Sequence, residues 1–533
     1  MNVDLAQVEF ESSVVATLPG DADRSNRPRA VADAAYTLVM PTPVSAPRLL
    51  AWSDELGAEL GLARPAATGP AVDILAGNAL APGMRPYAAR YGGHQFGNWA
   101  GQLGDGRAIT LGELITPSGE RQELQLKGAG PTPYSRFADG RAVLRSSLRE
   151  FLCSEAMHHL GVPTTRALSL VATGDQVVRD MFYDGNAQAE PGAIVCRVAP
   201  SFIRFGNFEI HSASEEIELL RGLADHVIAV HYPEYAGGTP RAYARWFSEI
   251  CRRTAVMIVH WMRVGFVHGV MNTDNMSILG VTLDYGPYGW LEGYDPSWTP
   301  NTTDASGRRY AYGNQPQIGM WNLARLAGAL LPLIGDKELL QEGLERYRST
   351  YTETWRAMLA DKLGLEALGR EGDEALIDEL FALLAAVETD MPIFFRALGE
   401  QVVSAPQPGN ADAGVLPQPV AAALYDGAAP KESQRARWHA WFLRWRERGE
   451  SCGLAASERR RRMHAANPLY LPRNYLAQQA IDAASTGDLV PLQRLLQVIR
   501  HPYEAHDEYE SFAERRPEWA RHRAGCSALS CSS

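Results

Sequence analysis

Apolar residues follow two different patterns in successive parts of the chain. Between about residues 87 and 208, short apolar runs are bounded by glycine or proline, which is typical of strands. The predicted strands are Ala108–Leu111, Glu123–Lys127, Leu168–Val171 and Ala193–Ala199. One helix is predicted among them over Ala142–Leu160, because apolar residues recur there at helical spacing and Gly161 and Pro163 follow.

From Ser214 onward the apolar spacing becomes mostly helical. A long helix is predicted over Arg241–Val264, and glycine-rich loops follow it until about Gln317. Further helices are predicted over Trp321–Ile334, Leu339–Leu363, Glu374–Val387, Arg435–Arg448 and Leu476–Val498. Residues 404–420 are rich in proline, glycine and alanine and indicate a loop. The predicted fold class is α+β, with a small strand-rich lobe followed by a larger helical lobe.

These patterns divide the chain of 533 residues into four parts. Residues 1–84 are predicted to be an N-terminal extension packed on the core, and residues 85–208 the strand-rich lobe. Residues 209–520 are predicted to form the helical lobe, and residues 521–533 a flexible tail that contains cysteine.

Charge and hydropathy exclude some classes of partner. The chain has 51 Lys and Arg against 62 Asp and Glu, a formal charge of −11, which favours neither nucleic acid nor an anionic membrane. Its first residues include acidic ones and lack the apolar core of a secretory signal. The longest apolar stretches fall short of the ~20 residues that span a bilayer. We therefore expect a cytoplasmic protein.

The six cysteines do not predict a scaffold or a zinc site. They are too sparse for a disulfide framework and lack the spacing of zinc ligands. Cys526 and Cys531 lie in a tail of small residues, GCSALSCSS. Exposed thiols and an untidy chain end are both compatible with that tail.

A glycine-rich stretch precedes the first predicted strand. It reads Y-G-G-H-Q-F-G-N-W-A-G-Q-L-G-D-G-R over residues 91–107. Glycine lets the backbone come close to phosphate oxygens and turn its N–H groups toward them. A hairpin over phosphates at residues 101–107 is one interpretation, and an ordinary turn is the other. The stretch matches neither a Walker loop nor a Rossmann fingerprint.

The strand around Lys127 places a cation opposite its apolar face. Leu124 and Leu126 share one face of the strand, so Lys127 points to the other. There it could pair with phosphate and with a carboxylate of the following helix, where Glu150 and Glu155 are available. A solvated lysine is the alternative.

A second set of polar residues follows the long helix, in V-H-G-V-M-N-T-D-N-M-S-I-L-G-V-T-L-D-Y-G over residues 267–286. A short strand pair there would bring Asn275 and Asp284 together as hard oxygen ligands for Mg²⁺ that carries phosphate. The ordinary interpretation of Asp274-Asn275 is a turn. Two arginines complete the set, because Arg197 and Arg204 lie among apolar residues and need a partner. A polyphosphate and an internal carboxylate are both candidates.

The order of these features resembles the protein-kinase fold. The segments YGGHQFGNWAGQLGDGRA, LQLKGAGPTPYSRFADGRAVLRSSLREFL, FGNFE, HGVMNTDNMSILG and LDYGPYGW more closely resemble the selenoprotein O family. This resemblance implies a two-lobed, kinase-like protein adenylyltransferase that attaches AMP to Ser, Thr or Tyr hydroxyls of proteins. It also implies that ATP is held in a flipped orientation, with Mg²⁺ or Mn²⁺, and that self-modification and the use of UTP are open questions.

The resemblance also implies roles for individual residues. Nucleotide contacts are implied for Gly104, Gly106, Arg107, Lys127, Asp139, Gly140 and Asp284. Arg197 and Arg204 match arginines that engage the γ-phosphate, and Glu150 matches the partner of the strand lysine. Asn275 and Asp284 match the metal ligands, and Asp274 the proposed base.

The catalytic loop departs from that of kinases at one position. In the kinase loop the base lies two residues after His and the metal-binding Asn seven residues after it. Counted from His268, the seventh residue is Asn275, but the second is Val270, which accepts no proton. Asp274 is therefore the candidate base. An atypical kinase and a non-catalytic, nucleotide-binding pseudokinase scaffold remain alternative functions.

One departure from the family concerns redox chemistry. Many bacterial members carry a cysteine after the D-Y-G segment that can pair with the C-terminal cysteine. Pro300 occupies the corresponding position here, so the resemblance leaves Cys531 without its usual partner.

Overall fold

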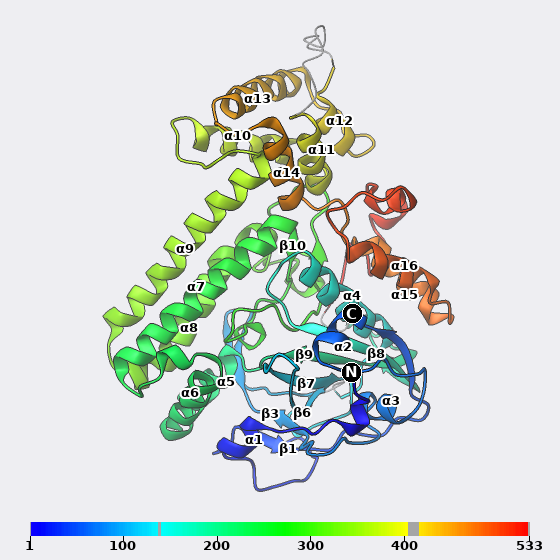
Figure 1. The fold of residues 1–533 in the computed structure, drawn as a ribbon, viewed down its shortest axis with the longest axis vertical. Coiled ribbons are helices and arrows are strands. Elements are labelled where there is room, and N and C mark those ends of the chain that lie inside the picture. Colours follow the sequence, from blue (N-terminus) through cyan, green and yellow to red (C-terminus); the bar gives the residue numbers. More distant parts are fainter. Residues whose placement is uncertain (1, 137–139, 403–414, 531–533) are drawn as a thin grey trace.

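The computed structural model, which describes residues 2–136, 140–402 and 415–530, contains a seven-stranded sheet that lies toward one end of the long axis (Figure 1). The strand order is β1-β3-β6-β7-β9-β8-β2, and every neighbouring pair is antiparallel. The strands are β1 Tyr36–Leu38, β2 Arg48–Trp52, β3 Tyr87–Ala89, β6 Ala108–Ile115, β7 Arg121–Lys127, β8 Arg166–Arg179 and β9 Gln188–Ala199. The four predicted strands are confirmed as β6 to β9, and each is longer than predicted.

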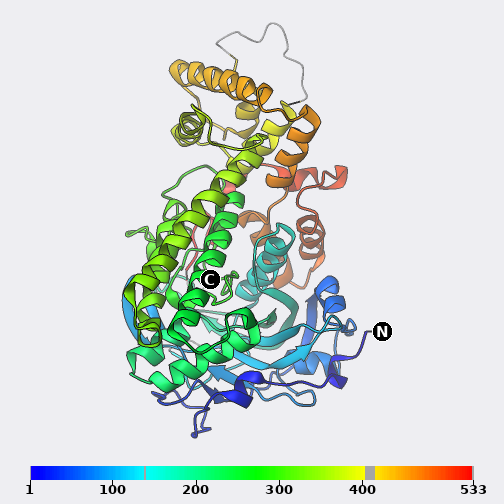
Figure 2. The ribbon, with the colours of Figure 1, turned by 60° about the vertical axis from the view of Figure 1, so that its left-hand side comes forward.

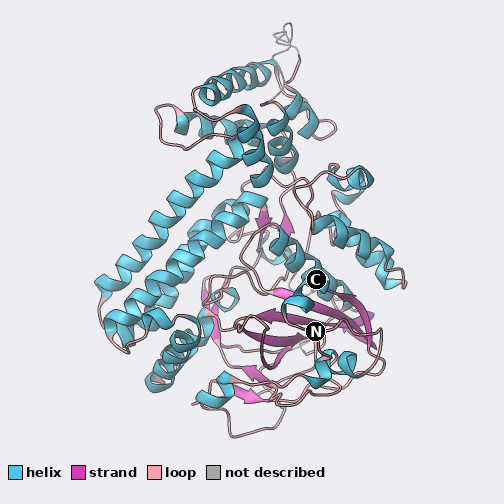
Figure 3. Ribbon diagram, in the orientation of Figure 1, coloured by secondary structure: helices cyan, strands magenta, loops and turns pink. Residues whose placement is uncertain are grey.

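Residues 1–84 do more than pack on the sheet. Their strands β1 and β2 form its two edges, with β1 beside β3 and β2 beside β8 (Figure 3). The short helices α2, Asp54–Glu59, and α3, Pro70–Leu75, belong to the same segment. Most of its buried apolar side chains share one core with Leu124 and Leu126 of β7. Strands of three to five residues leave too little alternation for the sequence to predict them.

The opposite face of the sheet carries the polar residues of β7. Gln125 and Lys127 alternate with the two leucines, as predicted, and Gln125 lies opposite Arg197 in the β7–β9 register. The helix α4, Leu144–His159, packs against β8 and β9. Leu148, Phe151 and Leu152 of α4 belong to the larger of the two main apolar cores, which continues into the helical part of the molecule.

The helical part extends away from the sheet along the long axis of the molecule (Figure 2). The long helix α7 packs against α8 and α9, while α10 to α14 gather at the far end. Its helices are α5 Phe205–Ala213, α6 Ile217–His231, α7 Pro240–Val264, α8 Gln315–Ile334, α9 Lys337–Leu363, α10 Asp373–Ala386, α11 Met391–Glu400, α12 Gln418–Ala423, α13 Glu432–Glu450, α14 Ala456–Ala466, α15 Asn474–Ser485 and α16 Val490–Ile499.

Most predicted helices are confirmed within a few residues of their bounds. The helix predicted over Leu476–Val498 is wrong in its continuity, because α15 and α16 are separate helices. Gly487, with φ +91°, lies between them in a backbone conformation that ends a helix. Among the described residues, no helix has both the length and the apolar character needed to cross a membrane.

The described part of the C-terminal tail is packed, which differs from the flexible tail predicted. Leu529 is fully buried, and its N–H donates to the carbonyl of Pro300 over 2.9 Å. Cys526 is also buried, so it is not an exposed thiol. The backbone pairing with Pro300 and Thr302 explains the order of this segment. Cys531 lies outside the described residues.

Candidate active site

A cleft beside the polar face of the sheet brings together side chains that are far apart in the sequence. Its lining comes from the glycine-rich loop, β7, β9 and the segment after α7. Among the predicted site residues, Gly104, Gly106, Arg107, Lys127, Arg197, Asp274, Asn275 and Asp284 line it. Arg204 and Glu150 lie directly behind this lining, in contact with Asp284 and Lys127 respectively. Gly140 is buried outside the cleft lining, and Asp139 lies outside the described residues.

Asp284 is the centre of the charged network. Its carboxylate accepts hydrogen bonds from Arg197 and Arg204 and lies 3.6 Å from Nζ of Lys127. Burial alone would raise its pKa, but the charges of Arg204, Arg197 and Lys127 hold the pKa of Asp284 well below its usual range. Asp284 is therefore an anion at neutral pH. Its φ of +58° places it in the left-handed region, which aspartate tolerates better than most residues.

Lys127 pairs with Glu150 rather than with Glu155. Nζ of Lys127 lies 2.6 Å from Oε2 of Glu150, and both side chains are buried. Glu155 lies one helical turn further along α4 and pairs instead with Arg166 at 3.1 Å. Burial lowers the pKa of Lys127, and the charge of Arg197 adds to this effect, while Glu150 opposes it.

Arg197 and Arg204 are almost completely buried and form hydrogen bonds and ion pairs with protein groups, although Nε of Arg197 has no partner among the described residues. Arg197 donates to Gln125 and lies 3.2 Å from Glu150. Arg204 donates to the backbone carbonyl of Asp274 over 2.8 Å. Of the two partners that the sequence allowed, an internal carboxylate is the one present, namely Asp284.

The two carboxylate oxygens of Asp274 have different surroundings. Oδ2 accepts from Nε2 of Gln95 over 3.1 Å, whereas Oδ1 is buried without a hydrogen-bond partner among the described residues. Burial raises the pKa of Asp274 to about 6. Gly93 is needed beside it, because a Cβ at that position would lie 2.8 Å from Oδ1. An oxygen that is buried but unpaired in a cleft can accept a proton or a hard cation.

The loop from His268 to Asn275 is held by hydrogen bonds to backbone carbonyls, one of them outside the loop. Nε2 of His268 lies 3.1 Å from the carbonyl oxygen of Leu283, next to Asp284. The amide nitrogen of Asn275 donates to the carbonyl of Val270 over 2.9 Å, and the carbonyl oxygen is the other polar atom of that amide. Asn275 follows Asp274 in a short 3₁₀ helix, Thr273–Asn275, and not at the end of a strand as predicted.

The glycine-rich stretch forms its hairpin earlier than predicted. The paired strands are β4, Gly92–Gln95, and β5, Asn98–Gln102, so the hairpin predicted at residues 101–107 is wrong in position. Residues 103–107 instead connect β5 to β6 along the cleft. Gly104 has φ +112°, and a Cβ there would lie 2.4 Å from the ring of Tyr134. Only glycine fits at this approach.

Several site residues were not singled out from the sequence. Asp105 is buried between Gly104 and Gly106, with Oδ1 3.8 Å from Arg204, and burial raises its pKa. Gln125 accepts a hydrogen bond from Arg197, and Gln95 donates one to Asp274. Tyr91, Gln95 and Asp105 belong to the glycine-rich stretch, so that motif was the available signal. Arg136 also lines the cleft, and it lies in the segment from Leu124 to Leu152 that resembles the selenoprotein O family, which was the available signal.

Comparison with known proteins identifies the family. The model of the family described as protein adenylyltransferase SelO matches residues 22–500, which include every described residue of the cleft. The chain belongs to this family.

Three relatives are similar to this chain over almost their whole length. A protein nucleotidyltransferase YdiU of Nitrosospira multiformis is 59% identical over 554 residues, covering 99% of this chain and 97% of the relative. A protein of the same name in Azoarcus sp. is 58% identical, covering 98% and 99%. Another, in Xanthomonas axonopodis pv. citri, is 58% identical, covering 99% and 100%.

The donor atoms of the cleft fit the divalent metal that the SelO family implies. Asp284 offers an ionised carboxylate, Asn275 an amide oxygen, and Asp274 an unpaired buried oxygen. Hard oxygen donors of this kind suit Mg²⁺ and Mn²⁺.

Proposed function

We propose that this protein transfers AMP from ATP to Ser, Thr or Tyr hydroxyls of proteins and releases pyrophosphate, on a kinase-like two-lobed fold. The observation that carries the proposal is the convergence of Lys127, Arg197 and Arg204 on Asp284 in one buried cleft. Three cations at one end of a nucleotide cleft suit a leaving group as highly charged as pyrophosphate. The strand lysine paired with a glutamate of the next helix supports the kinase-like fold.

In this proposal each residue of the cleft has a defined part. Lys127, Arg197 and Arg204 bind the β- and γ-phosphates and stabilise the charge that develops on pyrophosphate. Asp274 accepts the proton of the incoming hydroxyl on Oδ1. Asn275 and Asp284 would hold Mg²⁺ or Mn²⁺, which supplies further positive charge to the phosphates.

Binding of ATP requires the ion pairs around Asp284 to rearrange. In the structure described here both arginines are occupied by this carboxylate. Polyphosphate competes for the arginines with a higher charge and bidentate geometry, which leaves Asp284 available to a metal. The exchange conserves paired charges, because each buried cation gains a phosphate oxygen as it releases a carboxylate oxygen.

Labelled ATP tests the proposal. Incubation of the protein with a mixture of cell proteins should leave label on protein from α-labelled ATP and none from γ-labelled ATP. Label from γ-labelled ATP would indicate an atypical kinase. Label from neither, together with retained ATP binding, would indicate a pseudokinase scaffold, which Val270 favours. Intact-mass analysis of the protein itself tests self-modification, and labelled UTP tests the nucleotide. The cytoplasmic location predicted from the sequence remains part of this proposal.

A further inference from the structure

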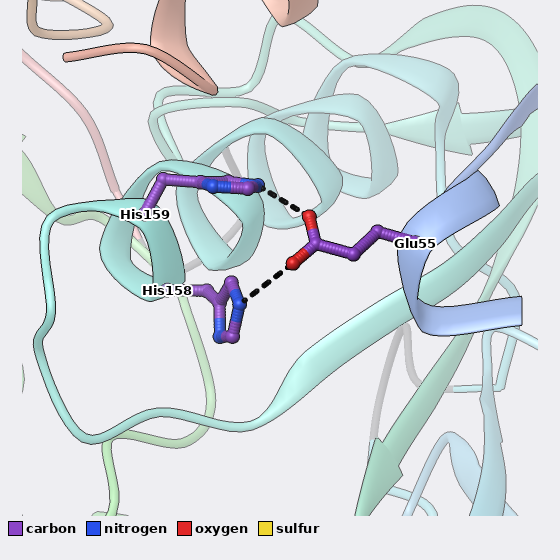
Figure 4. A group of neighbouring side chains, drawn as sticks. All are labelled: Glu55, His158 and His159. Carbon is purple, nitrogen blue, oxygen red and sulfur yellow. Dashed lines mark ion pairs between the residues drawn. The ribbon is translucent and has the colours of Figure 1, made fainter. Parts of the chain in front are cut away.

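A cluster of two histidines and one glutamate lies away from the cleft, where the N-terminal segment meets α4. Glu55 comes from α2, and His158 and His159 are consecutive residues at the end of α4 (Figure 4). Both imidazole rings turn a nitrogen toward the same carboxylate. Their three potential ligand atoms all lie within 4.8 Å of one another. The proposed nucleotidyl transfer makes no use of these residues.

The distances in this cluster are compatible with a bound metal ion. Nε2 of His158 lies 3.5 Å from Oε1 of Glu55, and Nε2 of His159 lies 3.2 Å from Oε2. The first separation is longer than an N–H···O bond, and the second is at the upper end of the usual range of about 2.7–3.2 Å. Donors bound to zinc at ~2.0–2.1 Å in tetrahedral geometry lie about 3.3 Å apart. Each imidazole nitrogen therefore lies about that far from one oxygen of the Glu55 carboxylate.

One nitrogen of the cluster is buried without a hydrogen bond. Nε2 of His159 forms none with any described residue, although it lies 3.2 Å from Oε2 of Glu55. The ring is turned toward this carboxylate, so the nitrogen is placed to bind a metal ion together with Glu55. An unpaired buried nitrogen is one of the features that a bound ligand explains.

The charges around the cluster leave room for a cation. Three carboxylates, those of Glu55, Glu59 and Glu155, face two guanidinium groups, those of Arg166 and Arg500. Counted over these five side chains, the local balance is one negative charge. Nη1 of Arg166 lies 3.1 Å from Nε2 of His158 and would have to release it. Arg166 would still keep Glu155, to which its Nε donates over 3.1 Å.

We propose that Glu55, His158 and His159 form a zinc site that joins the N-terminal segment to α4. Two imidazoles and one carboxylate are a common zinc donor set, and the fourth position is open to water. The site would fix α2, which follows edge strand β2, to the helix that carries Glu150. Zinc would therefore stabilise the packing of residues 1–84 on the strand-rich lobe.

Metal binding to the full chain tests the site. The protein is stripped with a chelator and titrated with Zn²⁺ in excess Mg²⁺, because Mg²⁺ occupies hard oxygen sites and does not compete for imidazole. We expect the wild type to bind one zinc per chain. His159→Gln and Glu55→Gln should each lower the affinity for zinc at least tenfold. Zinc should also raise the melting temperature of the wild type and leave that of the variants unchanged. Co²⁺ in the site should give the visible absorption of a four-coordinate ion with nitrogen ligands.

A second His–Glu cluster on the protein serves as a matched control. His501 and His506 each lie 3.9 Å from Glu504 and are more exposed than His159. The double variant His501→Gln/His506→Gln should bind zinc as the wild type does. Absence of zinc binding by the wild type, or equal binding by wild type and His159→Gln, would overturn the proposal. Melting curves of the metal-free variants establish that they are folded. Loss of zinc only from the control variant would place the metal at His501 and His506 instead.

Discussion

Arg204 and Asp284 form a buried ion pair across 80 residues of sequence, with Nη1 of the arginine donating to Oδ2 of the carboxylate. The arginine is 2% exposed, so its charge depends on this partner and on Asp105 at 3.8 Å. The pair joins the start of α5 to the loop after Leu283. It therefore holds the two sides of the candidate active site together when no nucleotide is bound.

The costs of removing the two members of this pair should not add. Arg204→Met leaves Asp284 with Arg197 and Lys127 only, and we expect the free protein to lose about 3–5 kcal/mol, the usual cost of breaking a buried pair. Asp284→Asn should cost a similar amount. The double variant should be less destabilised than the sum of the two, which a double-mutant cycle of denaturant unfolding measures. Additive losses would show that the two side chains are not coupled.

Nucleotide binding should depend on the same carboxylate. ATP with Mg²⁺ should raise the melting temperature of the wild type, since a ligand that binds only the folded state stabilises it. Lys127→Ala and Asp284→Ala should lose much of that shift. Equal shifts in the wild type and in Asp284→Ala would contradict its assignment as a metal ligand. Glu190→Gln is a suitable control, because it removes an Arg–Glu pair outside the cleft lining.

Asp274 should matter for turnover and not for binding. A general base contributes about 10²–10⁴-fold to a rate, so Asp274→Asn should lose AMP transfer by that factor and keep its affinity for ATP. Asparagine retains the size of the side chain and can still bond to Gln95, which limits structural change. Initial rates with α-labelled ATP, compared with calorimetric ATP binding, separate the two effects. Full activity in this variant would require another base, or none.

Glu123 should make stability depend on pH. It is buried on β7, and burial raises its pKa to about 8, with the charge of Glu113 adding to the effect. Between the unfolded value near 4.5 and 8 the folded state holds a proton that the unfolded state does not, so this group lowers stability as pH rises through that window. Glu123→Gln should therefore gain stability relative to the wild type from pH 5 to pH 8 and level off above.

Melting temperatures across that pH range measure the difference between the two proteins. Glu120→Gln, in the exposed turn before β7, should show no such trend. A constant difference between Glu123→Gln and the wild type from pH 5 to pH 8 would mean that Glu123 is already ionised in the folded protein.

Features that depend on local pattern and residue identity could be predicted from the amino-acid order alone. A period of two places Lys127 opposite Leu124 and Leu126, and the same alternation is present in β7. Val270 lies where a kinase has its acidic base, and a valine cannot accept a proton in any fold. Long helices such as α7 can also be predicted from apolar spacing, because many apolar residues in them recur with the same helical period.

Which distant groups meet could not be predicted in this way, because it depends on how the elements pack. Glu150 and Glu155 both lie on α4, which follows Lys127 in the chain. Packing turns Glu150 toward Lys127 and Glu155 toward Arg166. The edge strands β1 and β2 owe their pairing to neighbours and not to their own short patterns. Glu55 meets His158 and His159 across about 100 residues for the same reason. A sequence records the period of each element, whereas contacts between elements depend on how their faces pack.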